Sequence, residues 1–407
     1  MYKRILPAAL LLGAAAPPAL GQLTDGAEFN PAISLTLMGQ YSNYHGVDEL
    51  NLPGFQLGGE AGMPDSGFSL DHSEATMSAN VDPYFFGQLT AALSTHGDNT
   101  EVELEEAFIE TTSLPAGLGL TFGRFLSGIG YVNSKHSHVQ DFVDAPLPAQ
   151  AFLGGSYYDD GVRLEWVAPA ALFVETGAEA LRGGSFPAQK SAGSGMGAYS
   201  VFVRIGGDIG IQHNWRVGLS RLWTRPDGRT GGHSHSHDHD HDHDHDQGHG
   251  YGFSGSSDLN IVDITWKWAP TGNLQNRSLT VQTEYYDRDE SGRLTGQDAH
   301  EITDYSGRQK GLYAHAVYRF KPRWRTGLRY DRASSNNHGS DDALLAAAGL
   351  SDAGTAATRY SAMLDFSPSE FSRVRLQYTR NRLPDDRGNA VFLQYIMSIG
   401  AHGAHQF

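Results

Sequence analysis

Apolar residues alternate with polar or small residues along most of the chain from residue 31 onward. A two-residue period is typical of a strand whose two faces meet different surroundings. Sixteen segments have this period, which predicts an all-β protein of about sixteen strands. They are Ala32–Tyr44, Phe68–Val81, Tyr84–Thr95, Glu101–Ser113, Gly117–Phe125, Val162–Ala168, Leu172–Leu181, Ala198–Gly206, Gln212–Trp223, Asp258–Trp268, Ser278–Arg288, Gly311–Phe320, Trp324–Ala333, Thr358–Phe366, Phe371–Arg380 and Ala390–Ile399.

The connections between these segments alternate between short and long. Several short ones contain a proline, as in Asp82-Pro83 and Pro169-Ala170, where a missing N–H does no harm. An even number of strands, with short turns at one end and long loops at the other, is typical of outer-membrane barrels, whose closure leaves no sheet edge. The pattern predicts a transmembrane antiparallel β-barrel of the porin-like type, with both termini in the periplasm and no plug domain. The long connections are 46–67, 127–161, 182–197, 224–257, 289–310 and 334–357.

Charged residues share a face within several predicted strands. In 324–332, Leu328 and Tyr330 oppose Arg325 and Arg329, so the apolar face would meet lipid and the charged face a wet lumen. The alternation breaks once, near Glu106, which suggests a β-bulge. Charges on this face could set the ion preference of a pore, or they could pair with one another and only hold a loop. The predicted pore-lining residues are Arg124, Arg325, Arg329, Arg373, Arg375, Glu103 and Glu105.

The N-terminus has the pattern of a secretory signal. Lys3 and Arg4 precede an apolar stretch, and Ala19-Leu20-Gly21 fits a cleavage site, so residues 1–21 are the expected signal peptide and 22–407 the expected barrel. The chain has no cysteine, which excludes disulfides and thiolate metal sites. Its formal net charge of −16 argues against nucleic acid as a partner. Motifs of hydrolases, phosphate loops and zinc proteases are missing from the sequence, so no enzymatic activity is expected.

Residues 233–249 form a tract of alternating histidine and aspartate within the long connection 224–257. Imidazole is a common ligand of zinc, copper and nickel, and carboxylates add charge, so the tract can supply many overlapping weak sites. Such a composition cannot bury a core and is expected in solvent, in the fifth extracellular loop. A solvated acidic loop without a selected ligand is the alternative. The candidate ligands are His233, His235, His237, His239, His241, His243, His245, His249, Asp238, Asp240, Asp242 and Asp244.

The connection 127–161 is the loop that sixteen-stranded porins fold into the barrel, so we expect it to constrict the lumen. It contains His136 and His138, with Asp141 and Asp144 close by in sequence. These four side chains are a possible second metal site. A structural histidine pair is the competing interpretation, because two histidines on a loop are a weak signal.

Several motifs before residue 190 carry a family resemblance. They are Phe29–Leu35, Gly58–Gly62, Phe68–Leu70, Gly123–Tyr131 and Asp141–Pro146. Together they resemble a proteobacterial family of porin-like outer-membrane proteins associated with zinc supply, some of which are named zinc-regulated TonB-dependent outer-membrane receptors. The resemblance implies passage of zinc across the outer membrane. It implies no catalytic residues.

These observations lead to one hypothesis and two alternatives. The chain is expected to be an outer-membrane porin that lets zinc or a related divalent cation pass passively into the periplasm, with the histidine tract capturing metal weakly at the mouth. No tightly bound cofactor is expected, and a homotrimer is a possible assembly. The alternatives are a general or anion-preferring porin, and a surface metal-binding protein for which the barrel is only an anchor.

Overall fold

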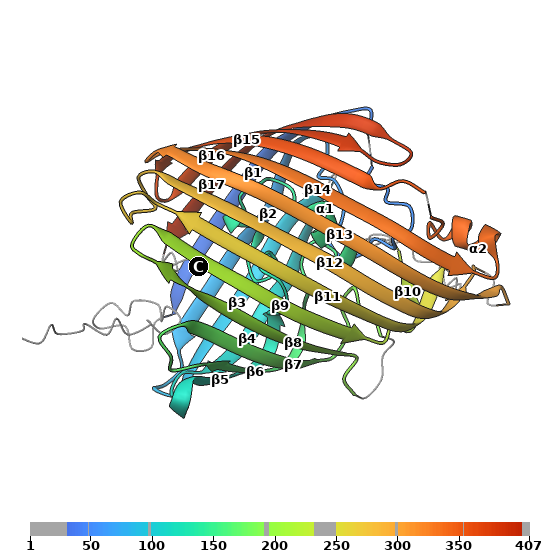
Figure 1. Cartoon of the computed structure of the whole chain (residues 1–407), viewed down its shortest axis with the longest axis horizontal. Helices are drawn as coiled ribbons and strands as arrows, with labels where there is room; N and C mark the ends of the chain where they lie inside the picture. Colours follow the sequence, from blue (N-terminus) through green and yellow to red (C-terminus); the bar gives the residue numbers. More distant parts are fainter. Residues whose placement is uncertain are drawn as a thin grey trace, which may run out of the picture.

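The chain folds into a closed antiparallel β-barrel of sixteen long strands, as the sequence predicts (Figure 1). The structure is a computed structural model, and it describes residues 31–47, 49–96, 99–190, 195–231, 250–297, 300–352 and 354–400. Each of the sixteen long strands pairs with the next long strand in sequence, and the last strand pairs with the first from Ser34↔Gly400 to His45↔Asn389. The predicted signal peptide and the histidine tract 233–249 lie outside the described residues.

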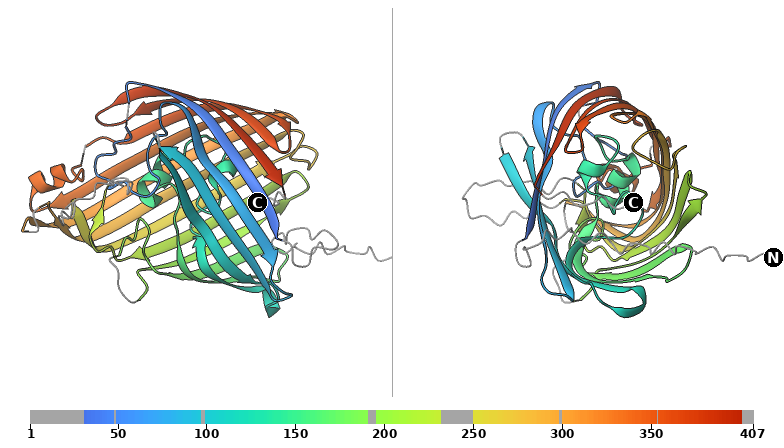
Figure 2. Two further views of the ribbon diagram at one scale, coloured as in Figure 1. Left: turned by 180° about the vertical axis from the view of Figure 1, so that it is seen from behind. Right: turned by 90° about the vertical axis from the view of Figure 1, so that its left-hand side faces the viewer.

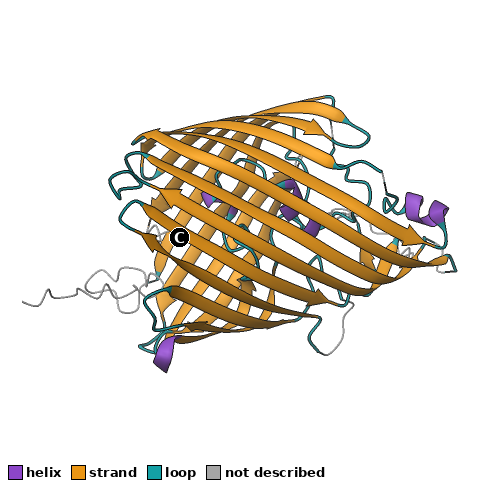
Figure 3. Cartoon of the chain, in the orientation of Figure 1, coloured by secondary structure: helices purple, strands orange, loops and turns teal. Residues whose placement is uncertain are grey.

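Strands dominate the structure, and the few helices are short (Figure 3). In the described part of the chain, no helix has the length and apolar character needed to span a membrane. The strands are β1 (Ala32–His45), β2 (Gly67–Asn80), β3 (Phe85–His96), β4 (Asn99–Thr111), β5 (Leu118–Leu126), β6 (Tyr158–Val167), β7 (Phe173–Leu181), β8 (Ala198–Ile209), β9 (His213–Thr224), the two-residue β10 (Arg229–Thr230), β11 (Gly252–Trp268), β12 (Ser278–Thr295), β13 (Ile302–Lys321), β14 (Trp324–Gly339), β15 (Ala357–Ser369), β16 (Ser372–Arg382) and β17 (Arg387–Gly400). The helices are α1 (Leu147–Leu153), α2 (Asp342–Ala347) and the 3-10 turns η1 (Pro115–Gly117) and η2 (Ser137–Val139).

Side chains alternate between the two faces of the wall. In β14, Leu328 is 68% exposed on the outer face, whereas Arg329 is 4% exposed on the inner face. Leu364 and Leu376 continue the apolar outer surface on the neighbouring strands. Because a hydrocarbon environment tolerates apolar side chains and excludes unpaired charges, this outer surface fits a lipid bilayer.

We expect Leu328→Arg to destabilise the barrel by about 2–4 kcal/mol, because it places a guanidinium among the apolar side chains of the lipid-facing surface of β14. Reversible unfolding in lipid vesicles with a denaturant would measure the loss. Leu328→Ile is the control and keeps an apolar surface. An equal stability of the two variants would contradict a lipid-facing position.

Two loops enter the barrel and pack inside it. The 127–157 loop carries helix α1, which lies within the ring of strands (Figure 2). The 46–66 loop also folds inward, although the sequence analysis did not predict this. Phe55 of one loop packs against Phe152 of the other, with ring centroids 5.5 Å apart, and Phe152 stacks on Tyr286 of the wall at 5.4 Å. An apolar core therefore fills part of the lumen.

Two β-bulges change which side chains face the lumen. In β4, the register with β3 shifts between Thr90↔Glu106 and Ala91↔Leu104, which makes Glu105 the extra residue. This confirms the bulge suggested by the break in alternation. In β2, the register with β1 shifts between Thr36 and Met38, opposite residues 71–74. As a result Glu105 and Glu106 both turn inward although they are adjacent in sequence.

Candidate functional site

A cluster of carboxylates and imidazoles lies between the bulged strands and the 127–157 loop. Glu74 comes from β2 and Glu105 and Glu106 from β4, while His136 and His138 come from the loop. The three glutamate side chains are only 2%, 3% and 9% exposed. We call these five residues, with His72 and Glu60, the lumen cluster.

His136 lies at the centre of the lumen cluster. Its Nδ1 is 3.2 Å from Glu74 Oε2 and 3.5 Å from Glu105 Oε2, and its Nε2 is 3.1 Å from Glu106 Oε2. His138 Nδ1 is 3.0 Å from Glu74 Oε1. Burial by itself lowers the pKa of His136, but the carboxylates of Glu74 and Glu106 outweigh it and raise the pKa well above its usual value.

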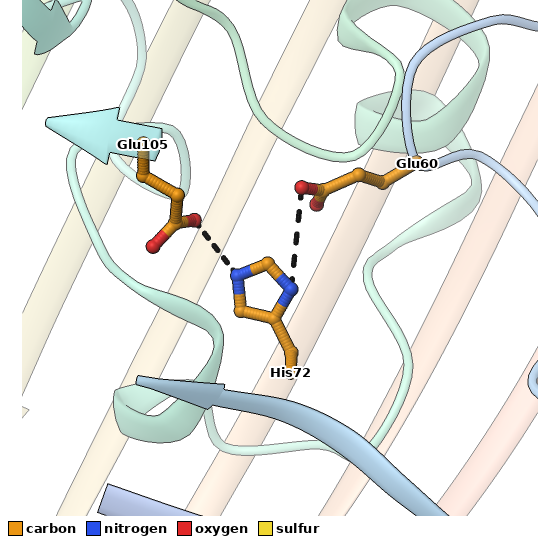
Figure 4. A group of neighbouring side chains, drawn as sticks. All are labelled: Glu60, His72 and Glu105. Atoms are coloured by element: carbon orange, nitrogen blue, oxygen red, sulfur yellow. Dashed lines mark hydrogen bonds and ion pairs between the residues drawn. The ribbon is translucent and has the colours of Figure 1, made fainter. Parts of the chain in front are cut away.

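The imidazole of His72 lies between two further carboxylates (Figure 4). Its Nε2 is 2.7 Å from Glu105 Oε1, and its Nδ1 is 4.0 Å from Glu60 Oε1. Glu60 belongs to the 46–66 loop, so the lumen cluster joins both inserted loops to the wall. Among the described residues, two groups have ligand atoms that all lie within 4.8 Å of one another: Glu60, His72 and Glu105, and Glu74, Glu105 and His136.

Asp141 and Asp144 do not join His136 and His138, which corrects the grouping expected from the sequence. Arg325 Nη1 is 2.8 Å from Asp141 Oδ1, and the two guanidinium groups next to Asp144 belong to Arg329 (3.0 Å) and Arg359 (2.6 Å). Arginines of β14 and β15 hold the two aspartates, whereas the two histidines contact glutamates of β2 and β4. Burial alone would raise the pKa of Asp144, but Arg329 and Arg359 lower it below its usual value.

The other predicted pore-lining residues make different contacts. Arg375 forms an ion pair with Asp365 at 2.9 Å, and Arg373 donates to the carbonyl oxygen of Gln140 at 3.5 Å. Glu103 accepts a hydrogen bond from the Tyr158 hydroxyl.

The structure corrects the prediction for Arg124, which does not line the lumen. Phe122, two residues away on the same face of β5, is 44% exposed, whereas Phe125 on the inner face is 1% exposed. Arg124 therefore lies on the outer side of the wall, where its Nε is 2.8 Å from Asp160 Oδ1.

Glu60, His72 and Glu74 were not among the residues predicted from the sequence to form a site. Each is an isolated polar residue, and nothing nearby in sequence links it to His136. The bulge in β4 was the available signal, because it predicts two adjacent glutamates on one face. Glu74 and His72 could be placed near Glu105 only with knowledge of the second bulge, in β2, which lies one strand beyond β3.

Comparisons with known proteins place this chain among outer-membrane barrels. No family description matches the chain. An uncharacterized protein of Aquifex aeolicus is 31% identical over 408 residues, covering 93% of this chain and 80% of the relative. The outer membrane channel DcaP of Acinetobacter baumannii has a similar structure, with a TM-score of 0.56, 12% identity and coverage of 93% of this chain and 100% of that one. OmpT of Vibrio cholerae, solved in a trimer form, has a TM-score of 0.50, 9% identity and coverage of 91% and 99%. The fold and the apolar outer surface place the protein in the bacterial outer membrane.

Proposed function

The chain belongs to one family with the Aquifex aeolicus protein and has the porin-like barrel fold of the outer membrane, and from this premise we propose that it carries zinc or a related divalent cation passively into the periplasm. The observation that carries the proposal is the lumen cluster. It puts four carboxylates and three imidazoles on the inner side of the barrel, next to the loop that crosses it.

The charges of the two walls support a preference for cations. Among the described residues, every ion pair of Glu60, Glu74, Glu105 and Glu106 is with a histidine. On β14, β15 and β16, by contrast, aspartates neutralise Arg325, Arg329, Arg359 and Arg375. The four carboxylates of the lumen cluster outnumber its three histidines, so the glutamate side of the lumen can attract cations.

The two inserted loops favour the interpretation that the transported solute is small. Phe55, Phe152 and Tyr286 belong to an apolar core within the barrel, which removes cross-section that a large solute would need. A dehydrated or partly hydrated ion needs far less space. The polar surface beside β2 and β4 is then the favourable route.

The histidine tract supports capture of metal at the mouth. In the sequence it lies between β10 and β11, within one of the long connections. Many weak sites would raise the local concentration of zinc, copper or nickel without opposing release. A homotrimer is part of the proposal, since one barrel of similar fold has been solved as a trimer.

Reversal potentials in planar bilayers test the proposal. Under a zinc chloride gradient the protein should prefer zinc over chloride, and replacing Glu74, Glu105 and Glu106 together with glutamine should abolish that preference. Loss of three negative charges from a narrow passage removes the attraction for cations. Deleting 233–249 should lower the zinc current at low zinc concentration and leave the selectivity at high concentration unchanged.

Asp160→Asn is the matched control, because it also exchanges a carboxylate for an amide but lies on the outer side of the wall beside Arg124. It should keep the wild-type reversal potential. A preference for chloride in the wild type would support an anion-preferring porin instead. One observation favours that alternative: among the described residues, Arg373 has no carboxylate partner within ion-pair distance, and it faces the lumen from β16.

A further inference from the structure

We propose that Glu74 Oε2, Glu105 Oε2 and His136 Nδ1 form a three-ligand binding site for one first-row divalent cation such as zinc. This inference rests on the proposed cation function and deepens it, because it names the atoms at which the ion pauses. The three ligands come from β2, β4 and the 127–157 loop.

The distances fit a small tetrahedral ion. His136 Nδ1 is 3.2 Å from Glu74 Oε2 and 3.5 Å from Glu105 Oε2. Two ligand atoms bound at 2.0–2.1 Å to a tetrahedral zinc ion are about 3.3 Å apart. A single imidazole nitrogen therefore faces two carboxylate oxygens at the separation that zinc requires.

Two of the three atoms are buried without a hydrogen bond among the described residues. They are Glu105 Oε2 and His136 Nδ1, and the Glu105 side chain is only 3% exposed. The two atoms face each other at 3.5 Å without hydrogen-bond geometry. A buried carboxylate oxygen is better solvated by a cation held closely than by an imidazole at this distance, so the pair can accept an ion between them.

The remaining polar atom of each ligand already has a partner. His72 Nε2 lies 2.7 Å from Glu105 Oε1, His138 Nδ1 lies 3.0 Å from Glu74 Oε1, and Glu106 Oε2 lies 3.1 Å from His136 Nε2. Glu106 lies against Nε2, so Nδ1 is the ring nitrogen that faces the other two ligands. Outer partners of this kind orient metal ligands in proteins.

The outer partners extend beyond the site. Glu60 contacts the side of His72 that faces away from Glu105, so a chain of contacts runs from the 46–66 loop through His72 to Glu105 (Figure 4). The site therefore connects both inserted loops to the β2 and β4 wall. Glu60, His72, His138 and Glu106 are positioning residues in this arrangement.

The chemistry selects a class of ion. Two carboxylates balance the charge of a divalent cation, and an imidazole nitrogen favours zinc and similar transition metals over magnesium or calcium, which prefer oxygen ligands. Three protein ligands leave the fourth position of a tetrahedron to an exchangeable water. Such a site releases its ion more readily than a closed site with four protein ligands.

Anomalous diffraction from crystals of the full chain soaked in zinc tests the inference. A peak should lie between Glu74, Glu105 and His136, and it should vanish in Glu105→Gln. Zinc titration of the purified protein should show loss of one site in that variant, with affinity lowered more than about 100-fold. Glu106→Gln should lower the affinity of the same site by about 10–100-fold, since it only orients His136.

Glu103→Gln is the control on the same strand, two residues from Glu105, and should keep the peak. The position of the peak separates this site from metal bound by the histidine tract. A wild-type map with no density at these three ligands, or with density that survives Glu105→Gln, would overturn the inference. Zinc flux is tested separately by the bilayer experiment. A zinc current without this density would support the proposed function and contradict the site. Density without a zinc current would support the site and contradict the proposed function.

Discussion

Asp144→Ala is expected to lower the free energy of unfolding by about 3–5 kcal/mol, because it leaves the buried Arg359 without a counter-ion among the described residues and leaves Arg329 with Asp331 alone. Asp144 is 8% exposed and faces Arg329 and Arg359, whose side chains are 1% and 3% exposed. Its Oδ1 also accepts a hydrogen bond from the Gln377 side chain at 2.6 Å. One carboxylate thus ties the middle of the 127–157 loop to three strands.

The same change should raise the single-channel conductance. Without the Asp144 carboxylate, the loop loses its side-chain contacts with Arg329, Arg359 and Gln377, and the two guanidinium groups repel one another more strongly, so this part of the loop can move away from the wall. Heat-induced unfolding on gels and conductance in planar bilayers would measure the two effects. The increase in conductance is specific to the loop, since a loss of stability alone would not produce it.

A double variant provides the matched control. Replacing Asp144 with leucine and Arg359 with methionine removes both charges of one buried pair, while Arg329 keeps Asp331 as its counter-ion, so the double variant should recover much of the lost stability. If the double variant is as unstable as Asp144→Ala, packing rather than charge holds the loop. A wild-type conductance in Asp144→Ala would contradict its role as the loop anchor.

Glu290→Ala is the second change with a large expected effect, again about 3–5 kcal/mol of lost stability. Glu290 Oε1 is 2.7 Å from Arg229 Nη1 and 3.5 Å from Arg288 Nε, and all three side chains are at most 1% exposed. Arg229 also donates to Gln56 Oε1 at 3.1 Å. Removing the carboxylate leaves two buried guanidinium groups side by side, which is unfavourable for both desolvation and repulsion.

Loss of Glu290 should also destabilise the two segments next to it more than the rest of the barrel. Arg229 lies in β10, shortly before the histidine tract, and Gln56 lies in the 46–66 loop. Hydrogen exchange should therefore increase in both segments before the rest of the barrel is affected. Asp287→Asn on the same strand is the control, because its partner Arg308 is 54% exposed and the pair contributes little. Equal losses in the two variants would contradict the argument from burial.

The sequence by itself determined the barrel. The two-residue period fixes sixteen strands because side chains on a strand alternate strictly between faces, and lipid outside and polar groups inside impose opposite demands on them. It underestimated β12, β13 and β14, which extend well beyond the predicted ends. Their added residues rise above the apolar band, where neither face contacts lipid and the alternation becomes weak.

Only the tertiary structure decided the site. His136 could be recognised as a candidate ligand, but its neighbours Glu74 and Glu105 are 62 and 31 residues away in sequence. Their meeting depends on two β-bulges and on the path of one loop inside the barrel, whose aspartates pair with arginines of β14 and β15. Local patterns report which face a residue occupies, whereas a metal site depends on how distant segments converge. For the same reason Asp141 and Asp144 belong to the arginines rather than to the nearby histidines.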